Sequence, residues 1–127
     1  LPLPRSVVSL SQEASVVPAR APSALDELKI MGLLRGADDA LEEDRLRRPP
    51  GRNAFEKYQA VLKLDPKNAV AEQGLVKVAG RYLTLSESAL SAGDLENAAH
   101  YLSEAVQVAP NHPSISRIEA ALANVGE

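Results

Sequence analysis

The chain repeats parts of its own sequence at a spacing of 44 residues. Gly36 superposes on Gly80, and Pro66 superposes on Pro110, when the sequence is shifted by that distance. The other matched pairs are Leu41 with Leu85, Glu43 with Glu87, Leu46 with Leu90, and Asn53-Ala54 with Asn97-Ala98. Glycine and proline each restrict the backbone conformation of a position, so these matches indicate repeated structure as well as repeated composition. An internal repeat of this length predicts two stacked copies of one supersecondary unit.

The residues that fill these units favour helices. Of the 127 residues, 20 are Ala and 18 are Leu, whereas Thr84 is the only threonine and aromatic residues make up 3%. Ala and Leu lead the helix-propensity scale, and a sheet protein would be richer in threonine and aromatic residues. We therefore expect an all-α fold.

Capping and turn residues divide each unit into a long helix, a turn and a shorter helix. In the first unit, Ser23 caps a helix that reaches about Arg47, and Pro49-Pro50-Gly51 forces the turn. In the second unit, Asn68 and Asp94 are caps, and Gly93 supplies the left-handed residue that ends the long helix. Within a helical domain of residues 23–127, the predicted boundaries are about 23–66 for the first repeat, about 67–110 for the second and about 113–124 for a capping helix.

Residues 1–22 differ from the rest of the chain, because they hold four of its nine prolines and show no helical period. Proline and the residue before it favour extended backbone, so we expect an extended Pro/Ser/Val-rich arm. This arm is either a linker from an upstream module or a segment that contacts a groove or a neighbouring subunit through Val7, Val8, Val16 and Val17. Since the chain begins without Met, we also expect a processed or cropped piece, with any signal peptide or anchor upstream.

The two units resemble the tetratricopeptide repeat family. The residues that carry the resemblance are Tyr82, Leu85, Ala98, Leu102 and Pro110 in the second unit and Leu41, Ala54, Tyr58 and Pro66 in the first. The chain departs from the family pattern at Asp38, at Ser86 and Ala89, at the Pro49-Pro50 turn, and in its period, which in the family is about 34 residues. The resemblance implies a helical-hairpin α-solenoid, in which the first helix of each repeat lines a concave groove that takes peptides.

The polar residues do not form a catalytic set. The chain has no Cys, and no His or Lys lies at a helical spacing that would activate Ser86, Ser88 or Ser91. His100 lies four residues from both Glu96 and Glu104, a spacing that suits a metal ion but is more typical of a solvated helix face. We expect a protein that is not an enzyme, with no metal and no cofactor.

Charge and hydropathy narrow the choice of partner. A net charge of −3 provides no basic surface for a nucleic-acid backbone. No apolar run approaches the roughly 18 residues of a membrane span. We therefore expect a protein or peptide partner, with a second copy of the chain as one candidate, and neither nucleic-acid binding nor membrane insertion by this segment.

The long helix of the second unit carries a second apolar stripe. Val76, Leu83 and Leu90 recur every seven residues, on a face rotated from the one that should pack against neighbouring helices. By the 44-residue shift, the matching positions in the first unit are Gly32, Asp39 and Leu46. We expect a concave partner-binding groove with an apolar floor and acidic edges, formed by Asp39, Glu43, Leu46, Val76, Leu83, Glu87 and Leu90. The alternative is that the three residues of the stripe belong to the core.

These observations predict a protein–protein interaction scaffold that binds a partner peptide or subunit through its concave face. Asp44-Arg45-Leu46 and Leu64-Asp65-Pro66 are similar to repeat segments that follow a membrane anchor in bacterial envelope proteins, which favours a periplasmic or cell-surface location without excluding the cytoplasm. Two repeats are few for a solenoid. The alternative is therefore a structural subunit that self-assembles into an oligomer or filament, with the arm linking neighbours.

Overall fold

The computed structural model describes residues 21–125, and it is all-helical over this range. Its elements are α2 (Ala24–Glu42), α3 (Ala54–Leu64), α4 (Ala69–Ser91), α5 (Leu95–Val108) and α6 (Ile115–Val125). The prediction of an all-α fold is confirmed for this part of the chain. The predicted arm contacts of Val7, Val8, Val16 and Val17 lie outside the described residues and stay predictions.

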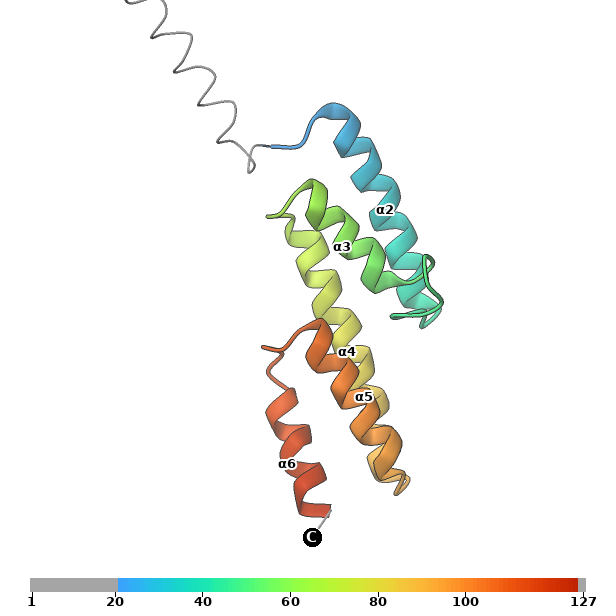
Figure 1. Cartoon of the computed structure of the whole chain (residues 1–127), viewed down its shortest axis with the longest axis vertical. Coiled ribbons are helices and arrows are strands. Elements are labelled where there is room, and N and C mark those ends of the chain that lie inside the picture. The colour runs from blue at the N-terminus through green and yellow to red at the C-terminus, as the bar shows by residue number, and fades with distance from the viewer. Residues whose placement is uncertain (1–20, 126–127) are drawn as a thin grey trace, which may run out of the picture.

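The helices form two antiparallel hairpins, and α4, the long helix of the second hairpin, also packs against the first hairpin (Figure 1). The first hairpin pairs α2 with α3, and the second pairs α4 with α5. Because α4 is 23 residues long, its first half packs against α3 and its second half packs against α5. The same helix contacts α2 and α6, and α6 also packs on α5.

Four of the helices begin at a side chain that accepts a hydrogen bond from a backbone N–H group. The hydroxyl of Ser23 accepts from the N–H of Asp26, whose carboxylate accepts from the N–H of Ser23, so α2 begins with a capping box. Asn53, Asn68 and Asp94 cap α3, α4 and α5 in the same manner. The predicted caps at Ser23, Asn68 and Asp94 are confirmed. A cap of this kind contributes about 1 kcal/mol to helix stability.

The helix α2 ends at Glu42, five residues before the predicted end at Arg47, so that prediction is wrong. The cause is Asp44, which adopts a left-handed conformation with φ of 58°. Its N–H donates to the carbonyl of Leu41, and the N–H of Arg45 donates to the carbonyl of Ala40. These two bonds are those of a Schellman motif. Aspartate occupies the left-handed region more readily than most residues, but much less readily than glycine, so this position was not marked in the sequence.

The long helix of the second hairpin, α4, also ends at a residue with positive φ. The two helix ends are not separated by the 44 residues of the sequence repeat. Gly93 has φ of 79° there, as predicted, and lies 49 positions after Asp44. The shorter helices end at Leu64 and Val108, which are 44 positions apart. The 44-residue shift therefore aligns the shorter helices but misaligns the long ones. The extra length lies in the connection between α2 and α3, residues 43–53, which occupies the place of the short turn at residues 92–94.

The two hairpins approach closely where α3 crosses α4. A Cβ atom built on Gly74 would lie 2.4 Å from ring atoms of Tyr58, so only glycine fits beneath this ring. Tyr58 is 1% exposed, and its hydroxyl donates a hydrogen bond of 2.6 Å to the carboxylate of Asp38 on α2. One aromatic side chain of α3 thus contacts both the helix before it and the helix after it.

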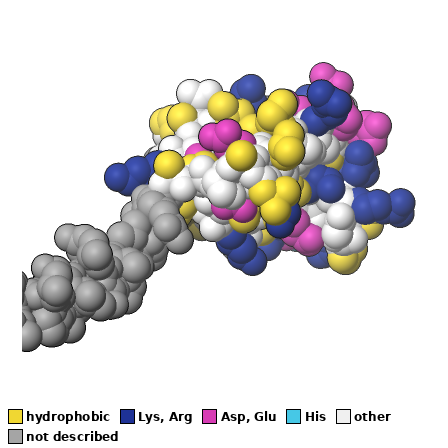
Figure 2. All heavy atoms as spheres, turned by 90° about the horizontal axis from the view of Figure 1, so that it is seen from above, with side chains coloured by type: hydrophobic (Ala, Val, Ile, Leu, Met, Phe, Trp, Pro, Cys, Tyr) yellow, Lys and Arg dark blue, Asp and Glu magenta, His cyan; other side chains and the backbone are white. Residues whose placement is uncertain are grey.

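The end of the molecule at which α2 and α4 begin exposes large apolar side chains. Leu25, Leu28 and Met31 are 62%, 66% and 63% exposed, and we call these three residues the end patch. Val70, in the first turn of α4, is 54% exposed at the same end. Figure 2 looks onto this end, where hydrophobic side chains lie across the surface with Lys and Arg around the edge.

The close approach at Gly74 leads to a stability prediction. Gly74→Ala is expected to lower the free energy of unfolding by about 1–3 kcal/mol, because the added methyl group collides with the Tyr58 ring. Gly32 is the matched control, since it also lies inside a helix but a Cβ there meets nothing within 4 Å. Gly32→Ala is expected to raise the free energy of unfolding by about 0.5–1 kcal/mol through helix propensity. Urea denaturation followed by circular dichroism measures both variants, and a Gly74→Ala protein as stable as the wild type would contradict this packing.

Candidate functional site

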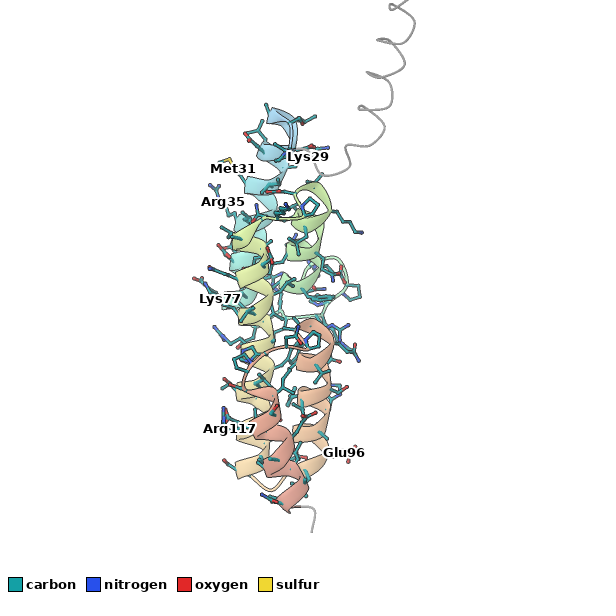
Figure 3. The ribbon with its side chains drawn as sticks, turned by 90° about the vertical axis from the view of Figure 1, so that its left-hand side faces the viewer. Lys29, Met31, Arg35, Lys77, Glu96 and Arg117 are labelled. Atoms are coloured by element: carbon teal, nitrogen blue, oxygen red, sulfur yellow. The ribbon has the colours of Figure 1, made fainter. Side chains whose placement is uncertain are left out.

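The face expected to bind a partner is formed by α2, α4 and α6. In Figure 3, Met31, Arg35, Lys77 and Arg117 project from one side of the molecule, whereas Glu96 of α5 projects from the opposite side. The structure thus gathers side chains of the three helices on one surface. The residues predicted to form its floor and edges do not all lie there.

Two of the predicted floor residues belong to the core. Leu83 is 2% exposed, and Leu46 is 4% exposed, so neither side chain is accessible to a partner. Leu46 falls in the connection after α2, because the 44-residue shift does not apply to the long helices. Leu90 is half-buried, and Val76 remains 47% exposed. Of the predicted floor, Val76 is the residue that presents a large apolar surface to solvent.

The predicted acidic edge is largely neutralised by arginine. Glu43 forms an ion pair of 2.8 Å with Arg45, and Glu87 on α4 pairs with Arg117 on α6. Asp39 is exposed and has no ion pair within residues 21–125. Together with Lys77, the arginines make this surface mixed in charge. The acidic groove stays a prediction, in which two of the three carboxylates lie in ion pairs with arginine.

An apolar groove lies beside Val76, between the first half of α4 and the segment that leads from α5 into α6. It encloses about 420 Å³. The residues that line it are Leu62, Glu72, Leu75, Val76, Val108, Ala109, Pro110, Asn111, His112 and Pro113. Its walls are mostly aliphatic, and Glu72 is the carboxylate at its edge. We call this feature the apolar groove.

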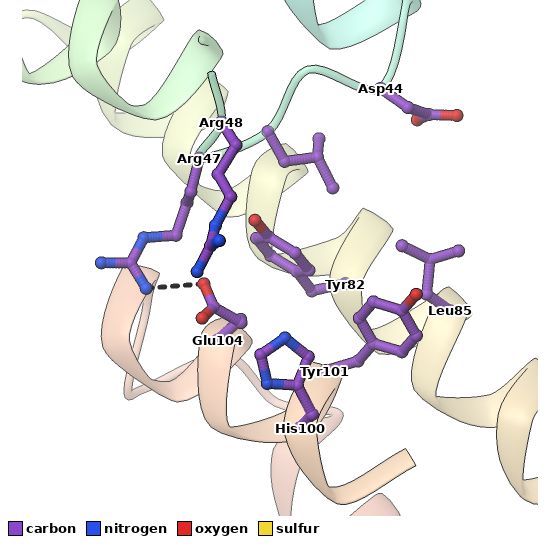
Figure 4. Close-up of a pocket in the computed structure, with 9 residues that line it drawn as sticks. Asp44, Arg47, Arg48, Tyr82, Leu85, His100, Tyr101 and Glu104 are labelled. Carbon is purple, nitrogen blue, oxygen red and sulfur yellow. Dashed lines mark hydrogen bonds and ion pairs between the residues drawn. The ribbon is translucent and has the colours of Figure 1, made fainter. Parts of the chain in front are cut away.

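A second, polar cavity lies where the connection between α2 and α3 meets the second hairpin, and we call it the junction pocket (Figure 4). It encloses about 250 Å³. The residues that line it are Asp44, Leu46, Arg47, Arg48, Tyr82, Leu85, His100, Tyr101 and Glu104. Figure 4 shows side chains of the connection facing side chains of α4 and α5 across this space.

Arg47 fastens the connection to α5. Its guanidinium donates to the carboxylate of Glu104 at 2.6 Å and to the side-chain oxygen of Gln107 at 2.9 Å. The same group lies over the ring of Phe55, 4.9 Å from the ring centre. The side chains of Arg47 and Glu104 are only 24% and 14% exposed, so their ion pair is better shielded from water than the ion pairs on the surface.

Aromatic rings form another wall of the junction pocket. Tyr82 and Tyr101 stack with their ring centres 6.4 Å apart. Burial raises the pKa of the Tyr82 phenol, and the negative charge of Glu104 raises it further, while Arg47 partly opposes both effects. Burial also raises the pKa of the Tyr58 phenol, and the hydrogen bond to Asp38 adds to that effect.

Sequence reasoning missed the junction pocket, because its residues come from three separated segments. The signal that pointed to it was the Pro49-Pro50 turn, which departs from the second unit and marks the longer connection. His100 and Glu104, considered above as metal ligands, both line this pocket, where Glu104 accepts from Arg47. Among the residues that the structure describes, no group of three His, Cys, Asp or Glu side chains is arranged to hold a metal ion.

Comparison with known proteins does not assign the chain to a class. No family model, no curated protein and no solved structure matches it. Within residues 21–125, no helix combines the length and the apolar character needed to cross a bilayer.

The raised pKa values lead to a prediction for alkaline solution. Stability is expected to fall as the pH rises above about 10, where the tyrosines of the unfolded chain lose their protons. The folded protein retains the protons of Tyr58 and Tyr82 to higher pH, so the unfolded state binds fewer protons and is favoured as the pH rises. Tyr58→Phe and Tyr82→Phe each remove one such phenol and are expected to show a shallower fall. Urea denaturation at about pH 8 and about pH 11 measures this difference, and equal losses in the wild type and both variants would contradict it.

Proposed function

We propose that this protein is a non-enzymatic interaction module of the tetratricopeptide type, which binds a partner polypeptide in the apolar groove between α4 and the segment that leads from α5 into α6. The observation that carries the proposal is the apolar groove beside Val76. Its volume of about 420 Å³ falls within the range of about 300–1,000 Å³ that is usual for ligand sites.

The packing within the hairpins supports the tetratricopeptide part of the proposal. Small residues are fully buried within both hairpins: Ala37 and Ala54 in the first, and Ser86 and Ala98 in the second. The hydroxyl of Ser86 donates to the carbonyl of Ala98 at 2.6 Å. Ser86, a departure from the family pattern, is thus satisfied inside the hairpin by a neighbouring backbone group.

The lining of the apolar groove defines the ligand that it fits. Leu62, Leu75, Val76 and Val108 offer aliphatic contacts, which favour an aliphatic side chain of the partner. Glu72 at the edge favours a basic residue next to that side chain. We therefore propose that the groove takes a leucine-like side chain flanked by lysine or arginine, within an extended or helical segment of a partner.

Val76→Asp is expected to weaken binding of such a segment by about tenfold or more, because a charge would be buried beneath the aliphatic side chain. The probe is a short capped peptide with one leucine flanked by lysines, and the measurement is the chemical-shift change of backbone amides around the groove. Val70→Asp is the matched control, since Val70 lies on the same helix, is 54% exposed and does not line the groove. The same peptide with glutamates in place of the lysines is expected to bind more weakly at low salt.

Two results would overturn the proposed site. One is a set of shift changes that avoids the groove altogether. The other is an equal loss of binding in Val70→Asp and Val76→Asp. Circular dichroism of both variants establishes that each is folded before the comparison is made.

The end patch favours a second candidate function, a structural subunit that assembles with copies of itself. The stripe of Val76, Leu83 and Leu90 is unsuitable as a contact between copies, because Leu83 is buried in the core. Leu25, Leu28 and Met31 instead place three highly exposed apolar side chains at one end of the two-hairpin stack. Contiguous exposed apolar surface is typical of contact sites between proteins.

Self-assembly through the end patch predicts a mass that depends on protein concentration. Leu28→Asp is expected to abolish that dependence, whereas Leu95→Asp, at a residue 36% exposed near the start of α5, is expected to retain it. Sedimentation velocity over a hundredfold range of concentration measures this. A monomer at every concentration in the wild type would remove the structural-subunit candidate and leave the interaction module.

A further inference from the structure

The connection between α2 and α3 is longer than closure of the hairpin requires. The second hairpin joins its helices through residues 92–94 after the same kind of Schellman ending. The first hairpin uses residues 43–53 instead. Fixing the backbone of each additional residue costs about 1–2 kcal/mol of conformational free energy, so an ordered connection of this length must be held by contacts of its own.

Those contacts fix the connection at both ends. The N–H groups of Ala54 and Phe55 donate to the carbonyls of Arg45 and Leu46 at 2.8 and 2.9 Å. Asn53 is fully buried, where its side chain accepts from the N–H of Glu56 and donates to the carbonyl of Pro49. The side chain of Leu46 is inserted in the core. Arg47 and Arg48 are therefore presented to the second hairpin from a fixed backbone.

The charges around the junction pocket leave one cation without a partner. Asp44 pairs with Arg81, and Glu104 pairs with Arg47, so these carboxylates are already neutralised. Arg48 also lines the pocket and makes no ion pair with any residue of the described range. Its guanidinium is the uncompensated charge of the site, and Figure 4 shows it inside the ring of lining side chains.

The remaining walls suit a short side chain with an apolar stem. Tyr101 and Leu85 line the pocket opposite the connection, and both are partly accessible. A space of about 250 Å³ is below the usual range for ligand pockets and accommodates a single side chain or a small ion. Because Asp44 and Glu104 are paired with Arg81 and Arg47, the site offers the single positive charge of Arg48, which one carboxylate neutralises.

We propose that the junction pocket is a second binding site, which takes the carboxylate side chain of an acidic residue on a partner polypeptide. Arg48 binds the carboxylate, and the methylene stem lies against Tyr101 and Leu85. This site is separate from the apolar groove, and it shares no lining residue with it. The inference therefore does not depend on what the groove binds.

The test uses two capped tetrapeptides that differ only in having one glutamate or one glutamine. The glutamate peptide is expected to bind about tenfold more tightly, with the largest shift changes at Arg48, His100 and Tyr101 in nuclear magnetic resonance titrations, and to weaken with added salt. Arg48→Gln is expected to abolish the preference for glutamate. Arg52→Gln is the matched control, because Arg52 is exposed on the same connection but does not line the pocket.

Three results would overturn the proposal. They are equal binding of the two peptides, an equal loss in the Arg48 and Arg52 variants, and tighter binding of a phosphoserine peptide or inorganic phosphate than of the glutamate peptide. Val76→Asp, which disables the apolar groove, is expected to leave the glutamate preference unchanged. Failure of the groove proposal and failure of this one are thus distinguishable in the same set of titrations.

Discussion

The contact of the Tyr58 ring with Gly74 is the interaction on which the arrangement of the two hairpins depends. It sets how closely α3 approaches α4, and α4 in turn supports α5 and α6. A side chain at position 74 would force these helices apart. The apolar groove and the junction pocket both include residues from the two sides of this contact, so their shapes follow from the same separation.

Features governed by neighbouring residues could be predicted from the sequence. The caps at Ser23, Asn68 and Asp94 were predicted because a capping side chain bonds to an N–H group only three residues away. The stop at Gly93 was predicted because glycine adopts positive φ without steric cost. The ending at Asp44 was not, because a left-handed aspartate is stabilised by backbone bonds that the sequence pattern does not reveal.

The helix end at Asp44, which was not predicted, explains the error at Leu46 in the predicted binding face. A single spacing was applied to the whole repeat, although the first connection contains additional residues. Leu46 was therefore assigned to a helix surface, whereas it lies in the core part of the connection. The pairing of Glu87 with Arg117 was not predicted either, because it joins helices whose relative rotation depends on tertiary packing. Val76 and Leu83 belong to the same seven-residue pattern on α4, but Val76 is 47% exposed and Leu83 is 2% exposed, so the pattern alone does not decide burial.

The Arg47 contacts have a mechanical consequence. The ion pair to Glu104 and the hydrogen bond to Gln107 both join the guanidinium of Arg47, in the first hairpin, to α5 of the second hairpin. Moving α5 away from the connection would lengthen both of these contacts at the same time, whereas moving α5 toward the connection would not. Opening the angle between the hairpins at Arg47 therefore costs the ion pair and the hydrogen bond at the same time.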